Sequence, residues 1–277
     1  MIRRHRGEQL TLAATASIGL PQVRNIPPGF NVLDVDPFHA TTVEALLLTF
    51  GPKVERIAFF DASAGVGGTY IDLTEKLTDR NANALAAAGS GALLNAMTTS
   101  DFLYVCLHHS ARGIGFDVVD ANAIATTLVG AYLNVHDVWT DLSVTDGTAS
   151  GGATFAIDGL VTWTVPAPEL WVNRSLPDAQ AVPNFLNGLR GYWVRFSVSD
   201  TLTNPTSIVS ATALANINVD ANPKTVRSEG EARVRIMSHN AARPMDRFHL
   251  DTSRYGSIEI TSTALATAIN LNWYEDR

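Results

Sequence analysis

The chain is poor in cysteine, with Cys106 alone among its 277 residues. A single cysteine excludes an intrachain disulfide. It lies in the apolar segment FLYVCLHH, residues 102–109, where a free cysteine behaves as a small buried hydrophobe. A thiol nucleophile would need an activating neighbour, and His108 shares the face of this strand. We expect a buried, unreactive thiol.

Short motifs that mark common enzyme classes are also missing. The chain has no GxxxxGK(S/T) or GxGxxG phosphate-binding motif, no GxSxG nucleophile elbow, and no HExxH or CxxC metal motif. Glutamate is scarce, and Glu169, Glu229 and Glu231 lie in no context that favours paired catalytic carboxylates. His108 and His109 are adjacent, so on a strand they point to opposite faces and cannot bind one ion together. We therefore predict that the protein is not an enzyme.

Charge is low, and lysine occurs only at positions 53, 76 and 224. The net charge of −7 and the pI near 5.4 disfavour nucleic acid as a partner, because such partners require a basic field. Arginine is favoured at desolvated contacts, since its planar fork is weakly hydrated; codon usage in a GC-rich genome is the alternative explanation of its excess. The one basic cluster, Arg3, Arg4 and Arg6 around His5, is predicted to make assembly contacts, with a frayed tail as the alternative.

Long hydrophobic runs are absent as well. No stretch of about 18 apolar residues exists that could cross a membrane as a helix, so no membrane partner is predicted. The basic N-terminus followed by LTLAATASIGL, residues 10–20, has the order of a signal peptide. Glu8 and Gln9 interrupt that order, and the apolar part is rich in threonine, alanine and serine. We interpret the segment as an ordered arm or a first strand.

Much of the chain has the alternating sequence pattern that is typical of antiparallel β structure. Between residues 138 and 198, short alternating segments are separated by Asp-Gly turns and carry tryptophan at 139, 163, 171 and 193. This predicts a mainly β protein, an antiparallel β-sandwich of jelly-roll type. We place an N-terminal arm at 1–30, the sandwich at 31–222 and additional C-terminal strands at 223–277. The last strands either form a small subdomain or return to complete the sheets.

Individual strands are predicted from the alternation of apolar and polar residues along the chain. Residues 102–109 are apolar on both faces and predict a central strand, with 113–119 as its hairpin partner. At Asp158–Gly159 a two-residue or a three-residue hairpin loop is possible. Core burial favours the longer loop, which aligns three large side chains on one face, namely Phe155, Val161 and Trp163.

The sequence also contains a helix candidate and a weak internal repeat, here called the echo. The helix candidate is 81–97, where alanine and leucine recur, although Gly89 and Gly91 weaken it. The echo links residues 68–79 with 137–148, which share an aromatic residue, then Asp-Leu-Thr/Ser, then Thr-Asp. It indicates either a duplicated strand unit or two uses of the same edge-strand chemistry.

Three aspartates suggest a possible cation site. Asp141, Asp146 and Asp158 lie in turns that are close in sequence, and loops of sandwich proteins can bind calcium through such oxygens. Aspartate in an Asp-Gly turn also has the local role of capping that turn. We predict no cofactor and no metal, and we keep calcium as the alternative.

Aromatic residues suggest a possible sugar site, because exposed tryptophan and tyrosine can stack on sugar rings. Trp171 follows a proline-rich loop and is expected to be exposed; Tyr192, Trp193 and Arg195 complete the candidate glycan-binding set. Alternation over 192–199 places Trp193 and Arg195 on a half-exposed face. Core packing of the tryptophans is the alternative. The sequon at 173–175 is interpreted as a chance occurrence.

The order of motifs between Asp101 and Ser199 is distinctive: DFLYVCLHH, GIGFDV, Asp-Gly-Thr at 146–148, Thr-Phe at 154–155, Asp-Gly at 158–159, Trp163, Pro166 and GYWVR at 191–195. In this order they resemble jelly-roll modules of tail, baseplate and capsid-accessory proteins of tailed bacteriophages. The resemblance is structural and carries no catalytic residue to transfer.

The resemblance implies a non-enzymatic structural protein of the virion, located on the capsid or the tail. Such a protein acts by self-association into a homo-oligomer and by docking on other virion proteins. The alternative is a carbohydrate-binding module that recognises a host surface glycan through the candidate set.

Overall fold

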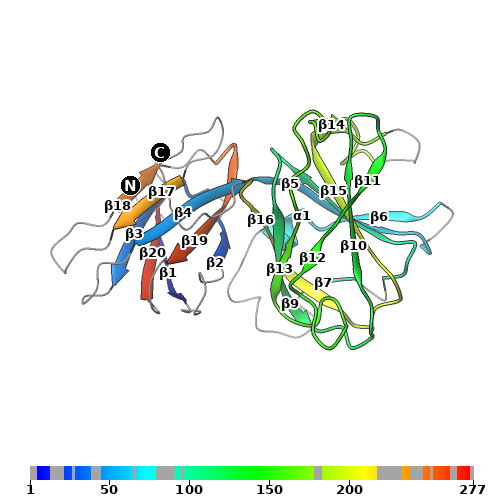
Figure 1. Ribbon diagram of the computed structural model, residues 1–277, viewed down its shortest axis with the longest axis horizontal. Helices are drawn as coiled ribbons and strands as arrows, with labels where there is room; N and C mark the ends of the chain where they lie inside the picture. The colour runs from blue at the N-terminus through cyan, green and yellow to red at the C-terminus, as the bar shows by residue number, and fades with distance from the viewer. Residues whose placement is uncertain are drawn as a thin grey trace. The chain divides into compact units, whose positions relative to one another are not determined.

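The chain folds into two compact units of antiparallel β structure. The computed structural model describes residues 5–12, 22–26, 29–38, 45–64, 67–78, 91–94, 97–177, 183–216, 233–237, 246–249, 252–262 and 267–274. One unit, here the terminal unit, combines Met1–Gly51 with Leu214–Arg277, and the other, the inserted unit, is Pro52–Ala213 (Figure 1). The mainly β, antiparallel fold class is confirmed; the jelly-roll topology stays a prediction.

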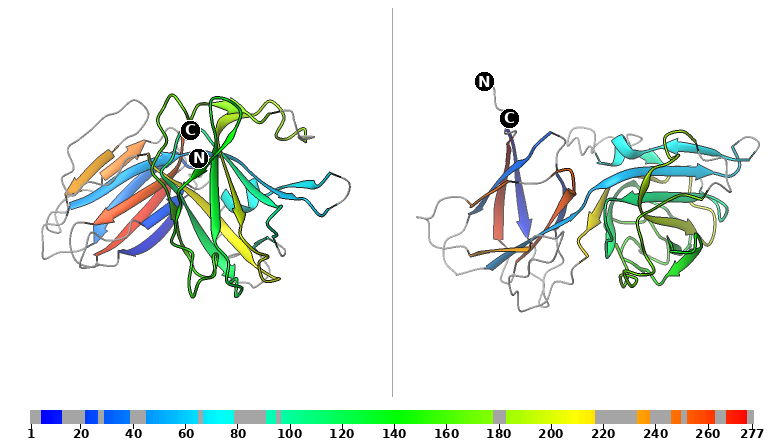
Figure 2. Two further views of the ribbon diagram at one scale, coloured as in Figure 1. Left: turned by 45° about the vertical axis from the view of Figure 1, so that its right-hand side comes forward. Right: turned by 90° about the horizontal axis from the view of Figure 1, so that it is seen from above.

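The described part of the terminal unit contains two four-stranded sheets. Their strands are β1 (His5–Leu12), β2 (Gln22–Asn25), β3 (Val32–Phe38), β4 (Ala45–Pro52), β17 (Arg233–Met237), β18 (Asp246–His249), β19 (Tyr255–Ser262) and β20 (Thr267–Tyr274). The first sheet has the order β1-β20-β3-β18, and the second has the order β17-β4-β19-β2. The blue strand β1 and the red strand β20 lie side by side, although they come from opposite ends of the chain (Figures 1 and 2).

Strand pairing at the N-terminus decides between the two interpretations of this segment, an ordered arm or a first strand, in favour of the strand. β1 pairs with β20 over its whole length, and β2 pairs with β19, so this segment is a first pair of strands. Pairing satisfies the backbone N–H and C=O groups that an isolated arm would leave to water. Of the expected assembly contacts, Arg6 lies in β1 opposite Trp273. Arg3 and Arg4 lie outside the described residues.

The boundaries of the two units differ from the predicted boundaries at residues 30 and 222. The C-terminal strands β17 to β20 pair with strands β1 to β4 from the other end of the chain. They therefore complete sheets instead of forming a subdomain of their own. The sandwich expected at 31–222 corresponds to the shorter inserted unit, Pro52–Ala213.

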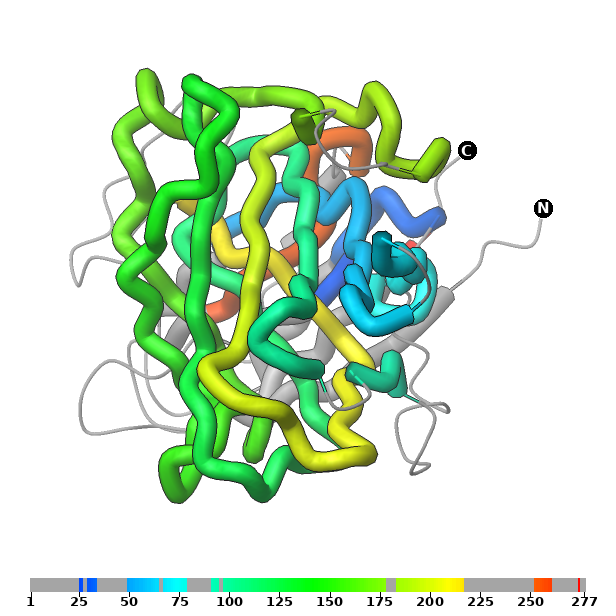
Figure 3. The backbone as a smooth tube through the Cα atoms, turned by 90° about the vertical axis from the view of Figure 1, so that its right-hand side faces the viewer, coloured from blue at the N-terminus to red at the C-terminus, as the bar shows by residue number. Residues whose placement is uncertain are grey.

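The described part of the inserted unit contains a seven-stranded and a five-stranded sheet. The larger sheet consists of β5 (Val54–Asp61), β6 (Thr69–Asp72), β8 (Phe102–Leu107), β10 (Leu128–Leu133), β11 (Trp139–Leu142), β14 (Arg174–Ser175) and β15 (Arg190–Val198). Its order is β11-β10-β15-β8-β5-β6, and β14 pairs with β15. The green β10 and the yellow-green β15 run side by side in Figure 3.

The smaller sheet has the order β12-β13-β9-β16-β7. Its strands are β7 (Ala92–Leu93), β9 (Gly113–Asp120), β12 (Thr145–Asp146), β13 (Gly159–Thr162) and β16 (Ser207–Leu214). Side chains of both sheets meet in one apolar core, here the main core, which includes the fully buried Val105, Phe196, Phe116 and Val161. Two sheets that share such a core form a β-sandwich.

A smaller apolar group, here the outer cluster, lies on the other face of the larger sheet. β8 contributes Tyr104 and Cys106 to it, and β15 contributes Trp193. Because Val105 and Phe196 of the same strands belong to the main core, the predicted alternation is confirmed. The central position of β8, between β15 and β5, is confirmed as well.

The hairpin predicted between β8 and β9 is wrong. β9 belongs to the other sheet, where it pairs with β13. The short segment between β8 and β9 crosses from one sheet to the other, and Ala111 of this segment is buried in the main core. Trp163 holds the crossing, because its Nε1 donates to Ala111 O at 2.8 Å and its backbone N donates to Arg112 O at 2.9 Å.

Both loops predicted at Asp158–Gly159 are wrong, although the predicted grouping of side chains is correct. β13 pairs with β12, and residues 147–158 form the connection between them. Phe155 lies in that connection with a φ of 51°. Its backbone N donates to Thr148 Oγ1 at 3.0 Å, which holds the ring in place. Phe155, Val161 and Trp163 all belong to the main core.

The helix expected at 81–97 falls mostly outside the described residues. In its described part the chain forms strand β7, which pairs with β16. A Cβ atom at Gly91 would lie 2.8 Å from Ser207 Oγ, so the close approach of the two strands requires glycine there. The helix that the described residues do contain is the short α1 (Thr74–Thr78).

The two echo segments occupy matching positions in the larger sheet, because β6 and β11 are its opposite edges. Their leucines, Leu73 and Leu142, are buried in the main core. Their aromatic residues, Tyr70 and Trp139, pack on the outer cluster on either side of Tyr104, at ring distances of 6.0 and 5.6 Å. This arrangement favours two uses of the same edge-strand chemistry.

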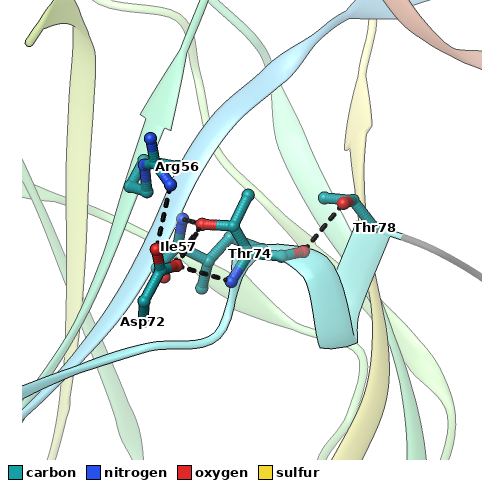
Figure 4. A network of polar contacts seen from close by, with 5 residues as sticks. All are labelled: Arg56, Ile57, Asp72, Thr74 and Thr78. Carbon is teal, nitrogen blue, oxygen red and sulfur yellow. Dashed lines mark hydrogen bonds and ion pairs between the residues drawn. The ribbon is translucent and has the colours of Figure 1, made fainter. Parts of the chain in front are cut away.

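Asp72 joins the edge strand β6 to α1 (Figure 4). Its carboxylate accepts hydrogen bonds from the backbone N and the hydroxyl of Thr74 at 2.9 and 2.6 Å, and Arg56 pairs with its other oxygen at 2.9 Å. Partial burial by itself would raise the pKa of Asp72, but the bonds from Thr74 and the charge of Arg56 leave that pKa below its ordinary value.

Candidate functional site

Trp171 is buried, and the expectation that it is exposed is wrong. Only 1% of its surface is accessible, and it belongs to the main core. Its ring makes edge contacts with Tyr132, Trp163 and Tyr192 at centroid distances of 5.9, 6.5 and 5.7 Å. The loop that carries Trp171 folds back on the end of the sandwich, because aromatic rings gain free energy by filling the main core there.

The other members of the predicted glycan-binding set do not share one exposed surface. Tyr192 packs against the main core, whereas the adjacent Trp193 lies in the outer cluster with 1% of its surface accessible. Trp193 Nε1 donates to Arg174 O at 2.9 Å. The face of β15 that we expected to be half-exposed is therefore covered at Trp193, with Leu186 as one of the covering residues.

Arg195 lies among aromatic rings on the outer face of the larger sheet. Its guanidinium carbon is 4.5 Å from the ring centre of Phe102 and 4.6 Å from that of Trp139. Such contacts stabilise a cation through the negative faces of the rings. Burial raises the pKa of the neighbouring Tyr104, and the charge of Arg195 opposes that increase. Arg195 thus joins β15 to an edge strand and to β8.

Two of the three aspartates considered for the alternative calcium site accept hydrogen bonds from other residues. Asp146 Oδ1 accepts from the backbone N and the hydroxyl of Thr148 at 2.9 and 2.6 Å. Asp158 Oδ1 accepts from Val118 N at 2.7 Å, and Asp141 is exposed on β11. Within the described ranges, no group of three or more histidine, cysteine, aspartate or glutamate side chains could hold a metal ion. The absence of a metal stays a prediction, with calcium at these residues as its alternative.

A cleft of about 720 Å³ opens where the chain enters β14 and β15. This volume falls in the range of about 300–1,000 Å³ that is typical of small-molecule sites. The cleft is lined mainly by polar side chains, which include Asp137, Asn173, Arg174, Ser175, Asn187 and Arg190. We treat this cleft as the candidate functional site.

One side of the cleft is built from a tight turn and an arginine. Asn134 Oδ1 accepts from the backbone N atoms of His136 and Val138 at 2.8 and 3.1 Å, and the turn places Asp137 at a φ of 62°. Aspartate tolerates this left-handed conformation better than most residues do. Arg174 donates to Val135 O and pairs with Asp137 Oδ2 at 2.8 Å, so two elements distant in sequence meet there.

The other side of the cleft carries Arg190, whose side chain is exposed. Its Nε and Nη2 donate to Oδ1 and to the backbone O of Asn173 at 3.4 and 3.1 Å. Within the described part of the chain, Arg190 forms no ion pair with a carboxylate. Pairing of β14 with β15 sets this geometry, with Ser175 opposite Arg190. Among the described residues that line the cleft, one guanidinium is therefore paired with a carboxylate and one is not.

Sequence reasoning missed this site for a clear reason. Its residues come from three separate segments, around 137, 172–177 and 187–190, and strand pairing together with the Arg174–Asp137 ion pair brings them together. The one local signal was the polar stretch Asn173-Arg174-Ser175, which we interpreted as a chance sequon. Neither the Trp171 side chain nor that of Trp193 lines the cleft.

Cys106 is fully buried, as predicted. Burial raises the pKa of its thiol far above the ordinary value; Glu55 raises that pKa further, and Arg56 opposes the increase. A thiol in this state is a poor nucleophile.

No protein-family model matches the chain, and no curated protein matches it. Among the described residues, no helix is long and apolar enough to cross a membrane.

Proposed function

We propose that the protein is a non-enzymatic structural component of a tailed-bacteriophage virion, in the tail, the baseplate or a capsid-accessory layer. It works by self-association into a homo-oligomer and by docking on neighbouring virion proteins. The observation that carries this proposal is the insertion of one β-sandwich into a second β unit, with two backbone crossings at Gly51–Pro52 and Ala213–Leu214. Two crossings distribute mechanical tension over two covalent connections, which suits a component of a particle.

The position of the phage-like motifs supports the same function. They extend from Asp101 to Ser199, all within the inserted unit, and they cover strands of both of its sheets. The resemblance therefore concerns a packed structural module. Its tryptophans at 163, 171 and 193 are buried, as expected of residues that stabilise the module.

Side-chain surfaces are better suited to mediate the docking than strand edges are. The described sheets of the inserted unit end in the short strands β6, β11, β7 and β12, of four, four, two and two residues. Short edge strands protect a sheet from uncontrolled pairing with another chain. We infer that assembly uses complementary faces, where arginine is favoured over lysine.

Localisation tests the structural proposal. In cryo-electron microscopy of the native particle, we expect density for this chain at a repeating position, in contact with neighbouring subunits. In parallel, sedimentation of the purified chain should show an oligomer, or binding to particles that lack it. A monodisperse monomer that ignores such particles would rule out the structural function.

Carbohydrate recognition is the second candidate function, and the polar cleft favours it. Asparagine amides, a serine hydroxyl and arginine side chains offer both donors and acceptors to sugar hydroxyls. This site differs from the aromatic platform expected from the sequence. A host surface glycan is the partner that this function implies for a virion protein, and a glycan array with the intact protein tests it.

A further inference from the structure

We propose that the cleft at β14 and β15 binds a saccharide that carries a carboxylate, with Arg190 as the group that pairs with that carboxylate. This inference rests on the second candidate function, carbohydrate recognition. It adds the chemical class of the sugar and the residue that selects it.

The charges in the cleft indicate where an anion binds. Arg174 is already paired with Asp137, at 2.8 Å, so these two groups balance each other. Among the described residues of the lining, Arg190 is the charge that no described carboxylate pairs with. The whole chain has a net charge of −7, so the cleft differs locally from the rest of the molecule. Asp137 repels a ligand carboxylate from the Arg174 side and thereby directs it to Arg190.

The orientation of Arg190 suits a carboxylate. A guanidinium has five N–H donors. Asn173 engages Nε and one donor of Nη2, which leaves the donors of Nη1 and the second donor of Nη2 for a ligand. These donors form the end of the fork, which can hold both oxygens of a carboxylate. The contacts with Asn173 also restrict the side chain before binding, which lowers the entropic cost.

The rest of the lining suits a sugar. The amides of Asn173 and Asn187 and the hydroxyl of Ser175 can each donate and accept, which matches the hydroxyl groups of a pyranose. Val172, Leu176 and Pro177 add apolar surface for the C–H groups of the ring. No aromatic side chain lines the cleft in its described part, so stacking of a nucleobase has no support there.

The test uses the full chain and calorimetric titration with defined probes. The acidic probes are oligosaccharides that end in glucuronic, galacturonic or N-acetylneuraminic acid, and the neutral probes are the corresponding glucose and galactose oligomers. We expect at least one acidic probe to bind about tenfold or more tightly than its neutral counterpart, since a charged hydrogen bond contributes that much.

Variants connect the effect to Arg190. Arg190→Gln should weaken the acidic probe about tenfold or more and leave the neutral probe unchanged. Arg190→Lys keeps the charge but loses the forked guanidinium, so this variant should also bind the acidic probe less tightly than the wild type does. Arg254→Gln is the matched control, because Arg254 is exposed in the terminal unit. Equal melting temperatures of the variants will show that the fold is intact.

The outcomes separate the two proposals. Equal binding of acidic and neutral probes, or an unchanged affinity in Arg190→Gln, overturns the acidic-sugar inference and leaves carbohydrate recognition standing. Failure of every saccharide overturns both, and binding of acidic peptides instead of sugars does the same. The structural function in the virion is independent of all four results.

Discussion

Three buried tryptophans of the inserted unit allow the contribution of an indole hydrogen bond to be measured separately from burial. Trp163, Trp171 and Trp193 have exposed fractions of 6%, 1% and 1%. Nε1 of Trp163 donates to Ala111 O at 2.8 Å, and Nε1 of Trp193 donates to Arg174 O at 2.9 Å. Nε1 of Trp171 is buried and has no hydrogen-bond partner in the described part of the chain.

Replacement of each tryptophan by phenylalanine removes the same atoms, so the variants differ mainly in this bond. In Trp163→Phe and Trp193→Phe a carbonyl loses its donor, which costs about 1–3 kcal/mol when the carbonyl is buried. In Trp171→Phe an unpaired buried N–H is removed, which is favourable by itself. We therefore expect Trp171→Phe to lose less unfolding free energy than the other two, by about 1 kcal/mol or more.

Urea unfolding followed by far-UV circular dichroism measures the three free energies, provided that the m-values agree. Trp171→Ala serves as the test of burial and should lose about 3–5 kcal/mol, because it empties a site in the main core. Equal losses in the three phenylalanine variants would refute the hydrogen-bond reasoning. A Trp171→Ala protein as stable as the wild type would refute the burial of this residue.

Three further predictions concern the larger sheet. Gly191→Ala should destabilise the protein in urea unfolding, because the new Cβ would lie 2.3 Å from Cys106 Sγ; stability equal to the wild type would contradict this close approach. Cys106 should react with a thiol reagent only after denaturant is added, since it is buried with a raised pKa; rapid labelling of the native protein would contradict this. Asp72→Asn should destabilise the protein above about pH 4. A lowered folded-state pKa gives stability that is present above the unfolded pKa and is lost as the pH falls through the folded pKa. The difference in unfolding free energy between the variant and the wild type should therefore shrink below about pH 4. A difference that is independent of pH would contradict the assignment.

The local alternation of residues along a strand proved sufficient to assign strand side chains to one or the other face of the sheet. In β15, Val194 and Phe196 belong to the main core and Trp193 belongs to the opposite face, as predicted. The central position of β8 followed from its apolar residues on both faces. Such assignments succeed because successive side chains of a strand point to opposite sides whatever the strand pairs with.

Several predictions that required knowledge of strand partners were wrong or stayed open. The hairpin expected after β8 failed because the chain crosses to the other sheet at Ala111. The choice between an arm and a first strand at the N-terminus stayed open in the sequence, because the partner β20 comes from the other end of the chain. The exposure expected for Trp171 failed because aromatic rings from three other segments of the chain pack against it.

Short-range properties of the sequence determined that the protein is mainly β and antiparallel, which side chains of its strands face the core, and that Cys106 is buried. The tertiary structure decided which strands pair, where the two units begin and end, and that Asp137, Arg174 and Arg190 line one cleft. The physical reason is that backbone geometry sets the direction of each side chain locally, whereas pairing and enclosure depend on the free energy of burying surfaces from distant segments together.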